Sequence, residues 1–246
     1  MLRKVFVILC CLLLAGSRVS AQESGRQDIF LESLWGQLAF QIGAPTLPMQ
    51  RAIKNQMGDI GFGAGLTVLS NPFSWGRNKR NSPFKLGAEL GYTYYGRFLS
   101  DVNINGYNGS YKTSYGILNL NAIARVSLSH MHRITPFAEV LAGGNFYLSR
   151  THENLSVIES ALGIQSFDLD NFASVGFNKG LAAGIVVGRP QSGTGVVLRV
   201  SYNVGSDIKY IVRNSLTYDA SANQLTYNIS KAPVKYFMIQ LGIGGF

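Results

Sequence analysis

The sequence predicts an all-β fold, a transmembrane antiparallel up-and-down β-barrel with eight strands, and three observations lead to this prediction. Apolar residues alternate with polar or small ones in segments of about ten residues or more, as in strands with two different faces. Charged residues make up only 14% of the chain, whereas 28 glycines, 12 tyrosines and 14 phenylalanines are present. Beyond the N-terminal segment no apolar run approaches the roughly 18 residues of a membrane-spanning helix. A ten-stranded barrel is the alternative.

The first 21 residues are predicted to be an export signal. Arg3 and Lys4 form a basic start, Val5–Ala15 is apolar but too short to span a bilayer, and Val19–Ala21 is a small-residue cleavage site. Residues 22–246 are then one domain, because no linker or change of composition divides them. Removal of the signal takes both cysteines and three of the 22 Lys and Arg residues. The remaining 19 face 13 Asp and Glu residues, a net charge of +6 without the clustered basic run that nucleic-acid binding requires.

Eight segments carry the alternation, and their polar faces indicate which side meets lipid. On these polar faces glycines and amides predominate and charges are few, which suits the crowded interior of a narrow barrel. The apolar faces, such as that of Leu118, Leu120 and Ala122, are therefore expected to face lipid. The predicted strands are about 34–43, 60–69, 84–97, 113–128, 136–149, 177–188, 196–206 and 235–246.

The connections between these strands alternate in length. Long loops are predicted at 44–59, 98–112, 150–176 and 207–234, and shorter turns at 70–83, 129–135 and 189–195. In the last long loop, 207–212 and 224–230 are expected to extend the flanking strands as a hairpin. An aromatic girdle is predicted at the loop end of the barrel, formed by Tyr92, Tyr94, Phe146, Tyr202 and Phe237. Phe84, Phe137 and Phe246 are expected to form a second girdle at the turn end.

Taken together, these features resemble the small outer-membrane β-barrel family of Gram-negative cells, which includes OmpA-like and OmpX-like domains and porin-family proteins. The resemblance rests on the signal Met1–Ala21, the eight alternating segments and the last strand Tyr236–Phe246, which ends on an aromatic residue. It implies an outer-membrane location, contact with outer-membrane lipids, and insertion by the outer-membrane assembly machinery with Phe246 as the assembly signal. Phe246 reaches the lipid-facing phase only if Gly244 and Gly245 form a bulge.

Inside the predicted barrel, a cluster of charges carries the strongest indication of a site. Glu89, Arg125, Glu139 and Arg199 lie at comparable depths on the inward faces, with Lys85 nearby. Buried carboxylates and guanidiniums must pair, because an isolated buried charge is very costly. The cluster is interpreted either as a plug that fills the lumen or as a gate or selectivity filter.

No catalytic, cofactor or metal motif stands out. His130 and His132 lack a third metal ligand, His152 has no serine partner on a strand face, and Asp168 and Asp170 lack the ligand spacing of a calcium site. We therefore expect a non-enzymatic protein without a cofactor, with a largely closed polar lumen and long extracellular loops for surface interaction or envelope integrity. A small porin passing small solutes is the alternative, and a lipid-modifying outer-membrane enzyme is the third possibility. No extracellular ligand is identified.

Overall fold

A computed structural model of the chain describes residues 34–53, 58–72, 83–104, 106–128, 133–154, 160, 172–188, 194–212, 215, 217–219, 221 and 224–245. The predicted signal peptide, His130, His132, Asp168, Asp170 and Phe246 lie outside the described residues. Within the described part of the chain, no helix is long and apolar enough to cross a membrane.

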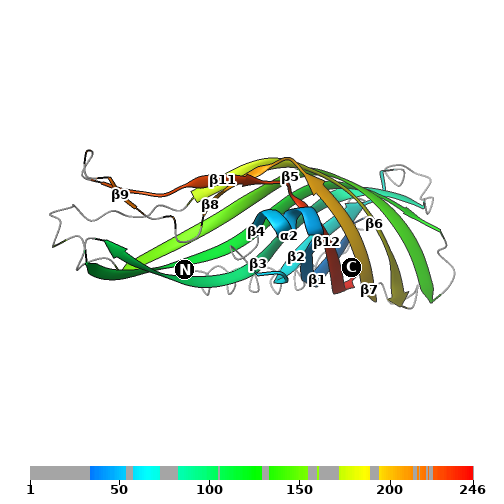
Figure 1. Cartoon of the computed structure of the whole chain (residues 1–246). Coiled ribbons are helices and arrows are strands. Elements are labelled where there is room, and N and C mark those ends of the chain that lie inside the picture. Colours follow the sequence, from blue (N-terminus) through cyan, green and yellow to red (C-terminus); the bar gives the residue numbers. More distant parts are fainter. Residues whose placement is uncertain are drawn as a thin grey trace, which may run out of the picture. The chain divides into compact units, whose positions relative to one another are not determined.

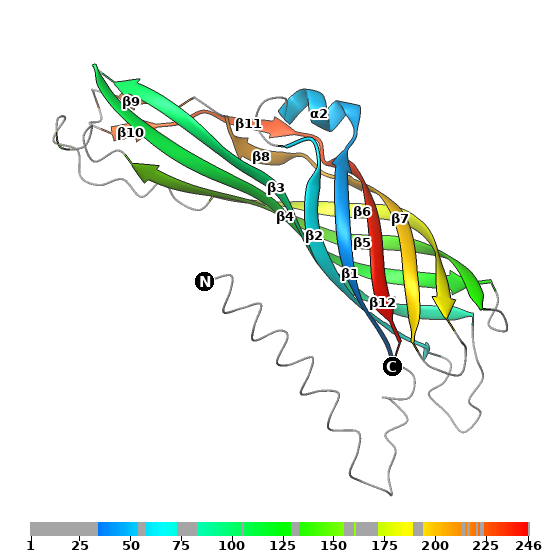
Figure 2. The same ribbon diagram turned by 90° about the horizontal axis from the view of Figure 1, so that it is seen from below.

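The chain folds into a closed antiparallel barrel of eight strands (Figures 1 and 2). The ring runs in the order β1-β12-β7-β6-β5-β4-β3-β2, so every strand pairs with its neighbours and the last strand closes on the first. Closure leaves no unpaired edge along the spanning part of the sheet. The strands are β1 Leu34–Pro45, β2 Gly61–Ser70, β3 Phe84–Ile104, β4 Tyr107–Ser127, β5 Ile134–Asn154, β6 Phe172–Gly188, β7 Gly195–Gly205 and β12 Lys235–Gly244.

The strand pairing fixes a steep tilt. Starting from Leu34 in β1, successive cross-strand partners lead around the ring and return to β1 at Ala44, ten residues further along. Strand number and this stagger together set the tilt, which is typically 35–45° in closed barrels. The partners in this path are Leu34, Ser70, Leu86, Ala124, Val140, Leu181, Tyr202, Phe237 and Ala44.

The outer face of the barrel is apolar, whereas the interior holds polar side chains together with two apolar clusters. Leu120 in β4 is 49% exposed and Leu241 in β12 is 56% exposed, whereas their neighbours Asn121 and Gln240 are 3% and 2% exposed. This alternation holds on all eight strands and confirms the predicted direction of the apolar faces. We call the outward apolar surface the apolar belt; its members include Leu38, Phe40, Leu90, Leu120, Val140, Leu181, Val200 and Leu241.

Three strands extend far beyond their predicted ends, and β6 begins at Phe172 rather than near 177. Strands β3, β4 and β5 have 21 residues each and continue beyond the barrel as an extended sheet (Figure 1). The predicted loop 98–112 is therefore wrong, because Ile104 pairs with Tyr107 in a tight hairpin that Gly106 turns with a φ of 86°. The segment is rich in Asn, Gly and Ser and lacks apolar alternation, so its strand character comes from the backbone pairing rather than from its side chains.

Smaller elements lie at the same end of the barrel (Figure 2). They are helix α2 Leu47–Ile53, strands β8 Ile208–Ile211 and β11 Ile229–Ala232, which pair, and strands β9 Thr217–Asp219 and β10 Gln224–Thr226, which also pair. The hairpin expected from 207–212 and 224–230 is confirmed only in outline, since 224–226 belongs to a separate small sheet. Neither small sheet joins the barrel, so the ten-stranded alternative is wrong.

Candidate functional site

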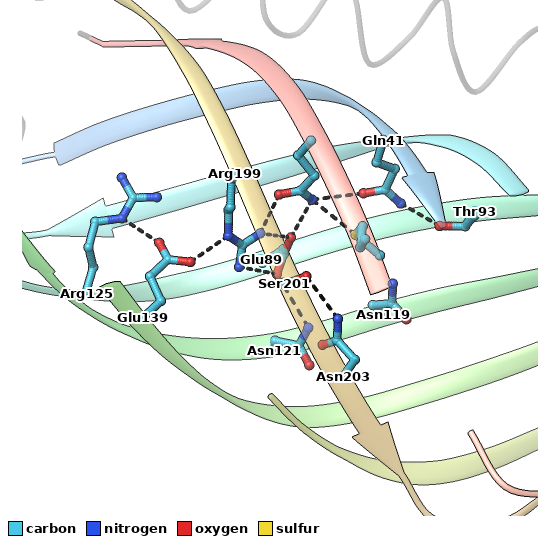
Figure 3. A network of polar contacts seen from close by, with 12 residues as sticks. Gln41, Glu89, Thr93, Asn119, Asn121, Arg125, Glu139, Arg199, Ser201 and Asn203 are labelled. Atoms are coloured by element: carbon cyan, nitrogen blue, oxygen red, sulfur yellow. Dashed lines mark hydrogen bonds and ion pairs between the residues drawn. The ribbon is translucent and has the colours of Figure 1, made fainter. Parts of the chain in front are cut away.

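Four of the five predicted interior charges, all except Lys85, meet as one connected chain across the lumen (Figure 3). The Arg125 Nε atom donates to Glu139 Oε1 at 2.5 Å, and the Arg199 Nε atom donates to Glu139 Oε2 at 2.6 Å. Arg199 then reaches Glu89, with Nη1 2.6 Å from Oε1 and Nη2 3.3 Å from Oε2. All four side chains are at least 96% buried. We call these residues the charge quartet; its two cations and two anions balance.

Arg199 occupies the centre of this arrangement because its strand faces that of Glu89. Strands β7 and β3 are four places apart in the eight-membered ring, so the pair spans the full width of the lumen. The two-point contact with one carboxylate fits the planar fork of a guanidinium. Gln240 supports both partners, accepting from Arg199 Nη1 and donating to Glu89 Oε1 at 2.8 Å.

Amide side chains continue the network toward the loop end. Gln240 donates to Gln41 Oε1 at 3.0 Å, and Gln41 donates to Thr93 Oγ1 at 2.8 Å. Gly65 leaves the room for this contact, since a Cβ there would lie 2.9 Å from Gln41 Oε1 and 3.2 Å from Gln240 Nε2. Tyr236 completes the layer by donating to Asn119 Oδ1 at 3.0 Å from the opposite wall.

At the turn end, aromatic rings cover the charge quartet. The Arg125 guanidinium lies 4.0 Å from the centre of the Phe137 ring and 4.7 Å from that of Trp35. Lys85, which pairs in register with Arg125, lies over Trp35 at 5.7 Å. The expectation that Phe137 belongs to an outward girdle is wrong: it is 3% exposed and points inward, because it has the same parity as Glu139 on β5.

At the loop end, an apolar cluster fills the lumen. Buried side chains from β3, β4, β5 and β12 meet Met49 from α2 and Ile208 from β8. Tyr115 and Tyr147 pack ring to ring at 6.2 Å, and Phe98 packs on Tyr115 at 6.1 Å. The cluster comprises Met49, Tyr95, Tyr115, Ile117, Tyr147, Ile208, Tyr210, Ala232, Val234, Tyr236 and Met238, and we call it the loop-end cluster.

Taken from one end to the other, the interior has an aromatic layer, a neutral charge layer, an amide layer and an apolar layer. Together these layers bring side chains from opposite walls into direct contact. Among the described residues, eight buried side-chain atoms have no hydrogen-bond partner, and they include Arg125 Nη2 and the two side-chain polar atoms of Gln37. Buried groups of this kind are usually satisfied by ordered water. Within the described residues, no group of three or more His, Cys, Asp or Glu side chains is arranged to hold a metal ion.

The apolar outer face, the buried polar network and the closure of the sheet by eight antiparallel strands together identify the class of fold. The chain has the fold of a small outer-membrane β-barrel. No model of a known protein family matches the sequence, and no curated protein matches it either. Similar solved structures include Neisserial surface protein A, with 9% sequence identity, a TM-score of 0.40, and coverage of 86% of this chain and 94% of that one.

Two further solved structures show a comparable likeness. Ail, the attachment invasion locus protein of Yersinia pestis, is 9% identical with a TM-score of 0.41, over 87% of this chain and 97% of that one. The outer membrane protein OprG from Pseudomonas aeruginosa is 14% identical with a TM-score of 0.43, over 87% of this chain and 94% of that one.

The structure places the residues of the predicted aromatic girdle on outward faces of the barrel wall. Tyr202 and Phe237 are cross-strand partners with ring centres 4.9 Å apart. Tyr94 is 38% exposed, and Tyr92 and Phe146 are partly exposed. The sequence interpretation missed the roles of several interior residues that complete the network. These are Trp35, Gln41, Thr93 and Tyr236, and their parity alone could have shown that they point inward.

Proposed function

We propose that the chain is a non-enzymatic integral protein of the outer membrane whose lumen is closed and whose extended sheet lies outside the cell. The apolar belt supports contact with lipid around the whole barrel, because every spanning strand presents apolar side chains outward. Barrels of this class have short periplasmic turns and long extracellular elements. That rule puts the 21-residue strands β3, β4 and β5 on the extracellular side.

The observation that carries the closed-lumen proposal is the contact between Arg199 and Glu89 across the full width of the barrel. An eight-stranded barrel is only wide enough for side chains to fill its interior. Here the charge quartet occupies one level of that interior and the loop-end cluster occupies another. A continuous file of water would have to displace both layers.

Conductance in planar bilayers tests this proposal. The refolded wild-type protein is expected to produce no steady channel openings at neutral pH. Reproducible openings of constant size would contradict a closed lumen and would favour a small porin.

The porin remains the second candidate because one observation favours it. Arg125 Nη2 and both side-chain polar atoms of Gln37 are buried without a hydrogen-bond partner among the described residues, as expected where water enters. In that case the charge quartet would act as a gate. Conductance that is low in wild type and rises sharply in Arg199→Ala would support the gate and contradict the plug.

The same proposal implies which lipids and which assembly machinery the protein contacts. Outer-membrane lipids contact the apolar belt, the outer-membrane assembly machinery inserts the barrel, and the extended sheet serves surface interaction or envelope integrity. The absence of enzymatic activity on lipids has a direct test, since overexpression is expected to leave the mass spectrum of lipid A unchanged. A shift equal to the gain or loss of an acyl chain would overturn it.

A further inference from the structure

A row of cations lies on the outward face of the extended sheet, immediately beyond the apolar belt. Arg97 in β3 and Arg150 in β5 are both cross-strand partners of Ser114 in β4 and are both exposed. Lys112, two residues before Ser114 in β4, has the same outward parity and pairs with Leu99. We call Arg97, Lys112 and Arg150 the cationic row.

The row begins where the continuous apolar surface ends, although one exposed apolar residue, Leu99, lies beyond Arg97 on β3 and is 53% exposed. Along β5 the outward residues are Phe146, Leu148 and then Arg150, so the guanidinium follows directly after an apolar residue that is 38% exposed. Along β3 the last outward aromatic is Tyr94, also 38% exposed, and the next outward residue is Arg97. The cations therefore stand at the level where hydrocarbon gives way to headgroups.

A β-bulge puts Arg97 on this face. Tyr94 pairs with Gly116, but Gly96 pairs with Tyr115, so Tyr95 is an extra residue in β3. Gly96 permits the bulge with a φ of 113°, in the left-handed region that favours glycine. Without the extra residue, the parity of β3 would turn Arg97 inward. With it, Phe98 points inward onto Tyr115 and Arg97 points toward the membrane surface.

The charges of the row favour an anionic occupant. Arg97 and Arg150 are two strands apart, a separation of about 10 Å between their strand axes. Like charges this close repel one another, and an anion between them removes the repulsion. Guanidiniums bind phosphate oxygens in a two-point manner that suits such an occupant.

We propose that the cationic row binds the phosphate groups of lipopolysaccharide in the outer leaflet. This inference rests on the outer-membrane location proposed above. The phosphates of that glycolipid lie just outside the hydrocarbon, at the level of Arg97 and Arg150, while its acyl chains contact Tyr94 and Leu148 below. The bulge at Tyr95 is thus a binding feature as well as a feature of the fold, because it adds the second arginine to the row.

The test measures binding of purified lipopolysaccharide to the refolded full chain in detergent micelles. Arg97→Gln and Arg150→Gln are each expected to weaken binding about threefold, and the double variant about tenfold, as for exposed ion pairs. Lipopolysaccharide that lacks the lipid A phosphates should bind weakly to wild type. Its affinity should equal that of intact lipopolysaccharide for the double variant. Arg133→Gln is the matched control, because Arg133 is exposed beside the exposed Ile134 at the opposite end of the barrel.

Several results would overturn the proposal. Unchanged binding in the double variant removes the site, and an equal loss in Arg133→Gln means that only net charge matters. A loss of heparin binding without a loss of lipopolysaccharide binding would assign the row to a soluble polyanion instead. Heat-modifiable migration of each variant on gels checks that the barrel is folded.

Cell fractionation separates this proposal from the proposed function. Wild type and the double variant are both expected in the outer-membrane fraction. Wild type found elsewhere would overturn the proposed location and the physiological occupant with it. Normal location combined with unchanged binding in the variant would overturn only the cationic row as a lipopolysaccharide site.

Discussion

Removal of the Glu139 carboxylate is the sharpest perturbation of the interior. Glu139 is the only member of the charge quartet that bridges both arginines, with its two oxygens 2.5 Å from Arg125 Nε and 2.6 Å from Arg199 Nε. In Glu139→Ala, Arg199 keeps its two-point contact with Glu89, but Arg125 loses its partner in the quartet while remaining buried. The quartet then carries an uncompensated positive charge.

The magnitude follows from this burial. Breaking a fully buried ion pair by removing one partner costs about 3–5 kcal/mol, and the side chains of Arg125 and Glu139 are only 2% and 0% exposed. The rings of Trp35 and Phe137 remain over the guanidinium in the variant and keep the cost toward the lower end of this range. We therefore expect a loss of about 3 kcal/mol in the free energy of unfolding.

The assay is urea unfolding of the refolded barrel in lipid vesicles, followed by tryptophan fluorescence and by heat-modifiable migration on gels. Asp101→Ala is the matched control, because it removes the same charge from an exposed position on β3. Glu139→Gln should fall between the two, since it keeps volume and one acceptor without the charge. Charge reversal of the pair, Arg125→Glu with Glu139→Arg, should recover part of the loss. A Glu139→Ala protein that unfolds together with Asp101→Ala would refute the reasoning.

Three further predictions concern the two faces of the wall and the bulge. Leu120→Arg and Val200→Arg on the apolar belt should each destabilise the barrel by about 2–4 kcal/mol in the same titration, and negligible effects at both would mean that these residues do not face lipid. Gly65→Leu should cost about 1–3 kcal/mol by crowding Gln41 and Gln240, whereas Ala64→Leu on the exposed face should be neutral, so equal effects at both would contradict a packed interior. Gly96→Val should cost about 1–3 kcal/mol because its φ of 113° is strained for a branched residue; stability equal to wild type would show that the bulge can relax.

The sequence determined the wall of this barrel because side-chain direction in a strand is a local property. Successive residues point to opposite faces, so the position of Leu120 settles that of Asn121 without knowledge of any other strand. The same parity placed Glu89, Arg125, Glu139 and Arg199 inside. Where parity was set aside in favour of composition, as for Phe137, the expectation was wrong.

Only the tertiary structure decided which interior residues meet and where strands end. Glu139 bridges two arginines, and Gln240 reaches Gln41, because the barrel closes with a ten-residue stagger that brings distant strands to one level. The extension through 98–112 depends on backbone hydrogen bonds between neighbouring strands. The polar side chains of this segment do not predict that pairing. The bulge at Tyr95 is one extra residue in β3 relative to β4. It therefore cannot be recognised from the sequence of either strand alone. Pairing is a relation between two segments of the chain, whereas the alternation that predicts each strand lies within a single segment.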